Sequence, residues 1–399
     1  MKIESLRLKN FRAFRDTEIR DIPRFCVLVG ANGSGKSTFF SIFAFLKEAM
    51  QTNVTVAAAK LGGSRGLLEI RSRQSSGPIE IELKFRAEIG QGRERLITYE
   101  LAIDEEKGRA VVVREILKYR RHERSGQPWH FLDFARGEGD AVTNELESVE
   151  TESDLKREPQ KLKSSDILAI KGLAQFEKFP AVKALGDLIE GWHISDFHIN
   201  RARSEQESGY AEHLSREGDN LSLVVEFLHK QHPEIFQKIL RKLEHRIPGL
   251  SKVETKVTDE GKILLKFQDG AFEDPFLARY VSDGTIKMLA YLVLLHDPSP
   301  HPLLCIEEPE NQLYPKFLME LAEEFQDYAR RGGQVFVSTH SPDFLNACEP
   351  KEVFWLTKAK GGSSIKAASK DEQIMRFVAE GDKLGWLWQQ GFFTGADPQ

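Results

Sequence analysis

Cysteine is scarce in this sequence, with three residues among 399. Cys26, Cys305 and Cys348 lie far apart along the chain, and the first two stand inside apolar runs. This spacing argues against a disulfide framework and against a cysteine-ligated metal site, because both need cysteines in pairs or clusters. We expect the thiols to be buried as small hydrophobic groups.

Long apolar stretches are also missing, since no run approaches the roughly 20 residues that span a bilayer. The amino end, MKIESLRLKNFRAF, alternates polar and apolar residues and contains no signal-peptide core. We therefore expect a cytoplasmic protein with no membrane partner. Sustained heptads are absent as well, which argues against a long coiled-coil arm.

The formal net charge is −5, so the chain has no overall attraction for nucleic acid. A DNA contact would need a local basic patch, and the sequence does not show whether its basic residues share one surface. Solvated surface positions are the favoured interpretation, and DNA stays open as a partner. The basic residues in question are Arg7, Lys9, Arg12, Arg15, Arg65, Arg71, Arg73, Arg201 and Arg203.

What is present is a globular composition, with 40% hydrophobic and 29% charged residues. Alternating and helical patterns divide the chain into four parts. We expect a first lobe with an antiparallel sheet at 1–119, and a charged insertion with a helical lobe at 120–250, mostly helical in the second half of 120–190. A second lobe follows at 251–370, and an aromatic-rich tail at 371–399.

The strongest motif is GANGSGKST, residues 30–38, between the apolar run 25–29 and the helical pattern 36–50. A strand, a glycine-rich loop and a helix in this order form a phosphate-binding loop, whose backbone N–H groups surround a β-phosphate at the positive end of the helix dipole. Lys36 would reach the β- and γ-phosphates, and Ser37 would ligate Mg²⁺.

A second motif is LLCIEE, residues 303–308, in which four apolar residues precede two carboxylates. In a parallel sheet such a segment places the acids at the carboxyl edge, where nucleotides bind. Glu307 is then the expected Mg²⁺ ligand and Glu308 the group that polarises the attacking water. His340 ends the next apolar run, 334–338, and would hydrogen-bond the γ-phosphate or that water.

These segments, together with Ser282-Asp283-Gly284-Thr285 before an apolar helix, resemble the ABC-class ATPases of the SMC/RecF/OLD-like branch, in the order seen there. The resemblance is close over 1–50 and 279–357. It implies an α/β ABC-type head: a mixed sheet around the P-loop, an antiparallel subdomain and an inserted helical lobe. It also implies ATP and Mg²⁺ as cofactors.

The resemblance assigns residues to three elements of a nucleotide site. Glu307 and Glu308 correspond to the Walker B pair and His340 to the switch histidine. Residues 282–285 correspond to the signature loop, which in the family contacts the γ-phosphate bound by the opposite protomer. The Walker A loop and the signature loop together contain Gly30, Asn32, Gly33, Ser34, Gly35, Lys36, Ser37, Thr38, Ser282, Asp283, Gly284 and Thr285.

Some positions depart from the family pattern. The signature reads SDGT rather than SGGQ, so Asp283 brings a negative charge near a phosphate. Glu307 stands where an Asp is commoner, which leaves direct Mg²⁺ coordination open. Gln74 is a weak match to the Q-loop. Leu313, Tyr314 and Pro315 follow Glu310-Asn311 where the family has its D-loop.

The function implied by the resemblance is ATP hydrolysis by a head that forms a homodimer, or a larger assembly, around the nucleotide. No nuclease motif is visible, so an effector protein, such as a nuclease of the Toprim or HNH type, is expected as partner in DNA repair or phage defence. One alternative is a non-catalytic switch driven by ATP binding alone. Another, a transporter ATPase subunit, is disfavoured by the long insertion between Met50 and Ser282.

Overall fold

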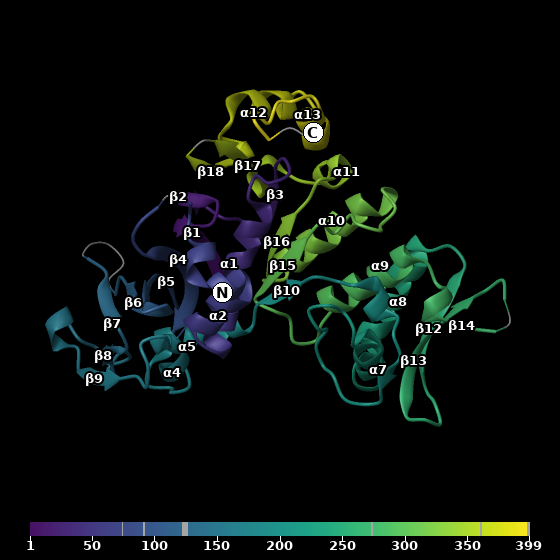
Figure 1. Ribbon diagram of the computed structural model, residues 1–399. Coiled ribbons are helices and arrows are strands. Elements are labelled where there is room, and N and C mark those ends of the chain that lie inside the picture. Colours follow the sequence, from purple (N-terminus) through teal and green to yellow (C-terminus); the bar gives the residue numbers. More distant parts are fainter. Residues whose placement is uncertain (74, 91, 122–126, 273, 360, 397–399) are drawn as a thin grey trace.

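The computed structural model describes residues 1–73, 75–90, 92–121, 127–272, 274–359 and 361–396. Within this part of the chain the strands form three sheets, and the sheet that contains the P-loop strand lies between the other two (Figure 1). Because each sheet must bury at least one face, the arrangement of the three sheets determines where the functional residues lie.

The central sheet has five parallel strands and one antiparallel edge strand. Its order is β10 (His193–Ser195), β15 (Leu303–Glu307), β16 (Gln334–Ser338), β3 (Phe25–Val29), β17 (Val353–Ala359) and β18 (Gly362–Ala367). The strands predicted at 25–29, 303–306 and 334–338 are therefore neighbours in space, although β3 ends at residue 29 and its neighbour β16 begins only at residue 334.

Both faces of the central sheet are covered, which explains why its strands are apolar without alternation. Cys26 and Leu28 of β3 pack into one hydrophobic core, and Val27 and Val29 pack into a second core on the other face. The first core lies against α1 (Lys36–Gln51) and the antiparallel sheet. The second lies against the helices that follow residue 199.

The antiparallel sheet begins with a hairpin at the amino end. Its order is β2 (Phe14–Arg20), β1 (Lys2–Phe11), β4 (Ile79–Ile89), β5 (Arg93–Glu106), β6 (Arg109–Tyr119), β7 (Trp129–Ala135), β8 (Glu138–Val142) and β9 (Arg157–Lys161). Ile3, Leu6 and Leu8 of β1 are at most 2% exposed. The strands up to Tyr119, apart from β3, form the antiparallel sheet predicted for residues 1–119.

The segment from residue 120 differs from its prediction in the first half. Strands β7, β8 and β9 extend the antiparallel sheet across residue 119, where the sequence indicated a change of lobe. The charged residues of these strands alternate with buried ones such as Phe131 and Phe134. Because the alternation is short, the hydrophobic periodicity of the sequence did not distinguish strand from helix here. The second half is helical as predicted, with α4 (Ala169–Leu173) and α5 (Pro180–Glu190).

The remaining helices divide between the two cores. Near α1 lie α2 (Val54–Gly62) and α3 (Leu67–Ile70). On the other side of the central sheet lie α7, α8 and α9 with the third sheet (Figure 1). The helices of this part are α6 (Ile199–Ala202), α7 (Leu221–Gln231), α8 (Pro233–Arg246) and α9 (Asp283–Leu295). The strands of the third sheet are β11 (Gln206–Glu207), β12 (Leu250–Val257), β13 (Lys262–Asp269) and β14 (Phe276–Leu277).

The carboxyl-terminal part begins with α10 (Lys316–Arg330) and α11 (Pro342–Leu345) and ends with α12 (Glu372–Ala379) and α13 (Leu384–Gln389). The aromatic-rich tail packs on the domain. Trp388 is fully buried, and its indole N–H donates to the Ala396 carbonyl at 2.7 Å. Phe393 packs edge-on against Trp355 of β17, with ring centroids 5.3 Å apart.

The cysteines are free thiols, and Cys26 and Cys305 are buried as expected. Burial raises the pKa of both thiols well above the ordinary range, so they remain protonated. Among the described residues, no helix has the length and apolar character needed to cross a membrane.

Replacing Trp388 by Ala should destabilise the protein by about 3–5 kcal/mol, because it removes a large buried ring and leaves the Ala396 carbonyl unpaired. Trp386 lies two residues earlier on the same helix and is 46% exposed, so Trp386→Ala should change stability by no more than about 0.5 kcal/mol. Urea unfolding followed by circular dichroism measures both. Equal losses would contradict the packing of the tail described here.

Candidate nucleotide-binding site

Parallel pairing brings the ends of four strands to one edge of the central sheet. After β3 the chain enters the loop at Gly30, after β15 it reaches Glu308, after β16 it reaches His340, and after β10 it reaches Asp196. Since β3, β15 and β16 are adjacent, the three predicted motifs lie side by side. The amide of Glu308 donates to the Ser338 carbonyl at 2.9 Å across this edge.

The loop at 30–35 has the backbone that glycine permits. Gly30, Gly33 and Gly35 have φ of 154°, 73° and 114°. A Cβ on Gly30 would lie 2.6 Å from the Leu356 carbonyl oxygen, so no larger residue fits there. Helix α1 starts after Gly35 with no side-chain cap and no acidic residue in its first turn. Its free N–H groups and positive dipole end are therefore available to an anion.

Lys36 lies over this loop. Its Nζ donates to the carbonyl of Gly30 at 2.6 Å and to that of Ala31 at 3.3 Å. Burial lowers the pKa of Lys36, and the nearby carboxylates of Glu308, Glu310 and Glu307 oppose that effect. The ammonium thus sits between the phosphate loop and the acidic strand end, where it can exchange its carbonyl partners for phosphate oxygens.

Ser37 and Glu307, the two residues predicted to hold Mg²⁺, are brought into contact. Desolvation raises the pKa of Glu307, the hydrogen bond from Ser37 lowers it, and the charges of Asp196 and Glu308 raise it further. A hydroxyl oxygen next to crowded carboxylates is a set of hard oxygen donors that suits Mg²⁺. Asp196 was not singled out in the sequence, because a three-residue strand precedes it.

Glu308 is held in a strained, left-handed backbone conformation with φ of 45°. Its Oε2 accepts a hydrogen bond from the Asn311 side chain at 3.0 Å, and its Oε1 lies 3.6 Å from His340 Nε2. Burial and the Lys36 charge lower the pKa of His340, so the ring is neutral at pH 7. The predicted water-activating carboxylate and the predicted switch histidine are therefore adjacent.

Glu310 is a functional candidate that the sequence reasoning missed. Its Oε1 accepts a hydrogen bond from the backbone N–H of His340, which fixes the loop after β16. Burial raises the pKa of Glu310, and the His340 N–H bond lowers it. Its sequence context, EEPEN, contained a third carboxylate two residues after the assigned pair. This third carboxylate was the feature of the sequence that could have identified Glu310 as a candidate.

A hollow beside the strand ends is lined by Ser195, Asp196, Phe197, Lys287, Tyr291, Glu307, Glu308, Asn311 and Gln312. Lys287 belongs to α9 and was also missed, because it lies within an otherwise apolar helix. Its Nζ donates to the Asn311 carbonyl at 2.5 Å, and burial lowers its pKa to about 8. Lys287 therefore links the signature helix to the loop that follows Glu308.

The predicted signature residues are not part of this hollow. Ser282 caps α9, accepting from the Thr285 N–H at 3.3 Å, and Ser282 and Asp283 are exposed. The negative charge of Asp283, noted as a departure from the family pattern, is paired with Arg203 at 2.6 Å. Gly284 and Thr285 complete the first turn of the helix. This loop is therefore accessible to another molecule, while its acid is partly neutralised.

Comparison with known proteins identifies the family. Residues 25–346 match the model for the family described as "AAA domain, putative AbiEii toxin, Type IV TA system". This range covers well over half of the chain and includes all of the edge residues named above. The chain belongs to this AAA family. No curated protein matches the sequence.

Solved SMC head domains share the fold over nearly the whole chain. An SMC head bound to the C-winged helix domain of ScpA gives a TM-score of 0.57 at 16% identity, over 94% of this chain and 100% of that one. An SMC head with an extended coiled coil from Pyrococcus furiosus, bound to the C-terminal domain of ScpA, gives 0.51 at 13%, over 95% and 99%. The α/β ABC-type head expected from the motifs is therefore confirmed.

Other predicted positions of this AAA domain are accounted for as follows. Tyr314 is 68% exposed and Leu313 is buried, at the segment compared with the D-loop. Gln74 lies outside the described residues.

Most of the basic residues considered for DNA pair with carboxylates, which favours their interpretation as solvated surface positions. The pairs are Arg7 with Asp16, Lys9 with Glu80, Arg65 with Glu69, Arg71 with Asp104, Arg201 with Glu217 and Arg203 with Asp283.

The Lys287 environment leads to a pH prediction. Its pKa is about 8 in the folded protein and near 10.5 when exposed, so between these values the unfolded chain binds more protons. This group therefore makes the free energy of unfolding rise with pH from about 8 to 10.5, and below pH 8 that gain is absent. Lys287→Met should remove this rise.

The measurement is the urea midpoint at pH 7.5 and at pH 9.5 for the wild type, Lys287→Met and a control. Lys238→Met is the control, because Lys238 is exposed on α8. The control should follow the wild type. If Lys287→Met also keeps the wild-type pH dependence, Lys287 is not the buried cation described here.

Proposed function

We propose that this AAA domain hydrolyses ATP and that two copies close around the nucleotide. The observation that supports this most is the single edge that carries an uncapped P-loop helix, Lys36, the Ser37–Glu307 contact and the Glu308–His340 pair. Phosphoryl transfer to water depends mainly on positioning and charge neutralisation, and these groups supply both.

The proposed roles follow from the positions of the side chains. The loop N–H groups and Lys36 would hold the β- and γ-phosphates, and Ser37 and Glu307 would hold Mg²⁺, directly or through water. When bound, Mg²⁺ neutralises charge on the phosphates. Glu308 would orient the attacking water and accept its proton, while neutral His340 would hydrogen-bond the γ-phosphate.

Dimerisation is proposed from the signature loop. Ser282 and Asp283 are exposed at the start of α9 and outside the hollow of their own chain. The Ser282 hydroxyl caps the Thr285 N–H, and the remaining first-turn N–H groups beside Gly284, at the positive end of the helix dipole, could contact an anion. In a dimer this loop would complete the nucleotide site of the partner protomer.

The movement of the two copies as they close around the nucleotide would act on a partner protein. The similar SMC heads are bound to domains of ScpA, and the family description names a toxin, which support an effector protein as the partner. We propose that this effector is a nuclease in DNA repair or phage defence. Recovery of the partner with purified protein, with and without ATP, tests this part separately.

Glu308→Gln tests the catalytic proposal. The variant should bind ATP and dimerise, while phosphate release falls by about 10²- to 10⁴-fold, because the amide cannot accept a proton from water. Glu323→Gln makes the same change at an exposed position of α10 and should leave turnover unchanged. Phosphate release and sedimentation with ATP provide the two readouts.

Two results would count against the proposal. Wild-type turnover in Glu308→Gln would remove Glu308 from the chemistry. A wild-type protein that dimerises with ATP and releases no phosphate would instead support the binding switch.

A further inference from the structure

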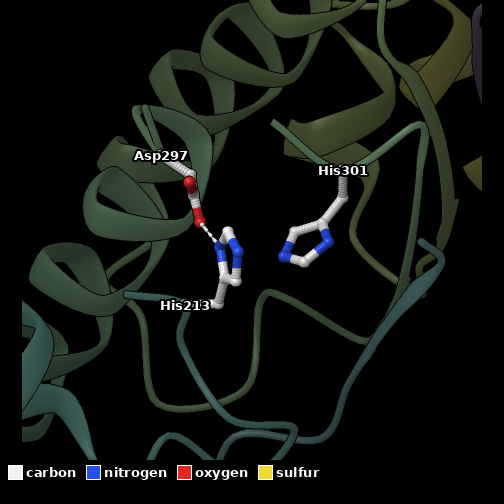
Figure 2. A group of neighbouring side chains, drawn as sticks. All are labelled: His213, Asp297 and His301. Carbon is white, nitrogen blue, oxygen red and sulfur yellow. Dashed lines mark hydrogen bonds and ion pairs between the residues drawn. The ribbon is translucent and has the colours of Figure 1, made fainter. Parts of the chain in front are cut away.

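A second group of chemically active side chains lies away from the nucleotide edge. His213 comes from the segment between β11 and α7, Asp297 follows the end of α9, and His301 precedes β15 (Figure 2). The atoms they offer as ligands all lie within 4.8 Å of one another. Ligands that share a tetrahedral zinc ion are ~3.3 Å apart, so a small closing movement suffices.

The hydrogen bonds of the two imidazoles fix their protons. His213 Nδ1 lies 2.7 Å from Asp297 Oδ2, and His301 Nδ1 lies 3.0 Å from the Gly191 carbonyl oxygen. Carbonyl and carboxylate oxygens are acceptors, so these contacts favour the tautomer in which each Nδ1 carries the proton. In that tautomer Nε2 of each ring offers a lone pair to a ligand. The two rings face each other across the site in Figure 2.

Among the residues that the structure describes, Nε2 of His301 is buried and has no hydrogen-bond partner. The same holds for Nε2 of His193, which is 6% exposed and whose ring centroid lies 4.9 Å from that of His301. Buried nitrogens without a partner are costly, and a bound cation is one way to satisfy them.

Asp297 completes a recognisable metal-site arrangement. Its side chain is 4% exposed, and its second oxygen accepts from the Ser299 N–H at 2.8 Å. A carboxylate that holds the Nδ1–H of a ligating histidine fixes the ring and raises its basicity. The His213 side chain is 44% exposed, which gives an ion a path from solvent.

We propose that His213, His301 and Asp297 form a site for one divalent transition-metal ion, with Zn²⁺ as the probe. The histidines bind through Nε2, and Asp297 acts through His213 or as a third ligand. Two imidazole nitrogens select transition metals over Mg²⁺ and Ca²⁺, which prefer oxygen ligands.

The ion would connect three elements that lead to the nucleotide edge. Asp297 ends the helix that begins at Ser282, and His301 begins the strand that ends at Glu307. In the segment that carries His213, the Arg216 carbonyl accepts from the Asp196 N–H at 2.9 Å. The metal would thus fix the position of α9 and of Asp196 relative to β15.

Metal titration of the full-length, chelator-treated protein tests the proposal. One equivalent of Zn²⁺ per chain should bind in competition with a chromophoric chelator, and Co²⁺ should give the intense visible absorption of a four-coordinate site. His213→Ala and His301→Ala should abolish both signals. Asp297→Asn should weaken Zn²⁺ affinity by about 10- to 100-fold.

His245→Ala is the matched control, since His245 is exposed at the end of α8, and it should bind as the wild type does. Melting temperatures without metal show which variants fold. If an alanine variant does not fold, the Co²⁺ spectrum of the wild type and the Zn²⁺ affinity of Asp297→Asn still test whether the site binds metal. Wild-type protein without stoichiometric binding, or unchanged binding in His301→Ala, overturns the site. None of these measurements depends on ATP turnover, so the result for the metal site is independent of the result for ATP hydrolysis.

Discussion

Parallel pairing of β3, β15 and β16 is the constraint on which the candidate site depends. The central residues of these strands are apolar and buried on both faces, so polar side chains stand only at the strand ends. Parallel register then brings those ends together: Val337 pairs with Val27 and with Ile306. Hydrophobic burial of the strands therefore places the glycine loop, the carboxylates and the histidine at the same edge of the sheet.

The charges at this edge are the second determinant. Asp196, Glu307, Glu308 and Glu310 gather around two buried lysines, and the pKa values of Glu307 and Glu310 are raised while those of Lys36 and Lys287 are lowered. Such an acidic edge repels a polyphosphate unless a divalent cation accompanies it. The arrangement therefore favours a nucleotide–Mg²⁺ complex over a free nucleotide.

Much of this could be read from the sequence. The P-loop, the carboxylate-ended strand and His340 were predicted because each follows a short apolar run, and the P-loop also has its characteristic glycine spacing. Asp196 could not be predicted, because it follows a strand of only three residues, β10. Lys287 could not be predicted, because it lies in α9, a helix whose sequence is otherwise mostly apolar. The His213–Asp297–His301 group depends on three segments that only the fold brings together. Strands β7–β9 were missed because their alternation is short and mixed with charges.

The central claim is that one chain completes the nucleotide site of another, and ATP turnover by a mixture of two variants tests it most directly. Glu308→Gln removes the carboxylate proposed to activate water, and Ser282→Arg blocks the exposed loop proposed to contact the partner's nucleotide. Each variant alone should be inactive. A mixed dimer would combine the intact Glu308 of one chain with the intact Ser282 of the other, so mixing should restore part of the turnover. If the mixture stays as inactive as its components, or if Ser282→Arg alone retains wild-type turnover, the site is not shared between chains.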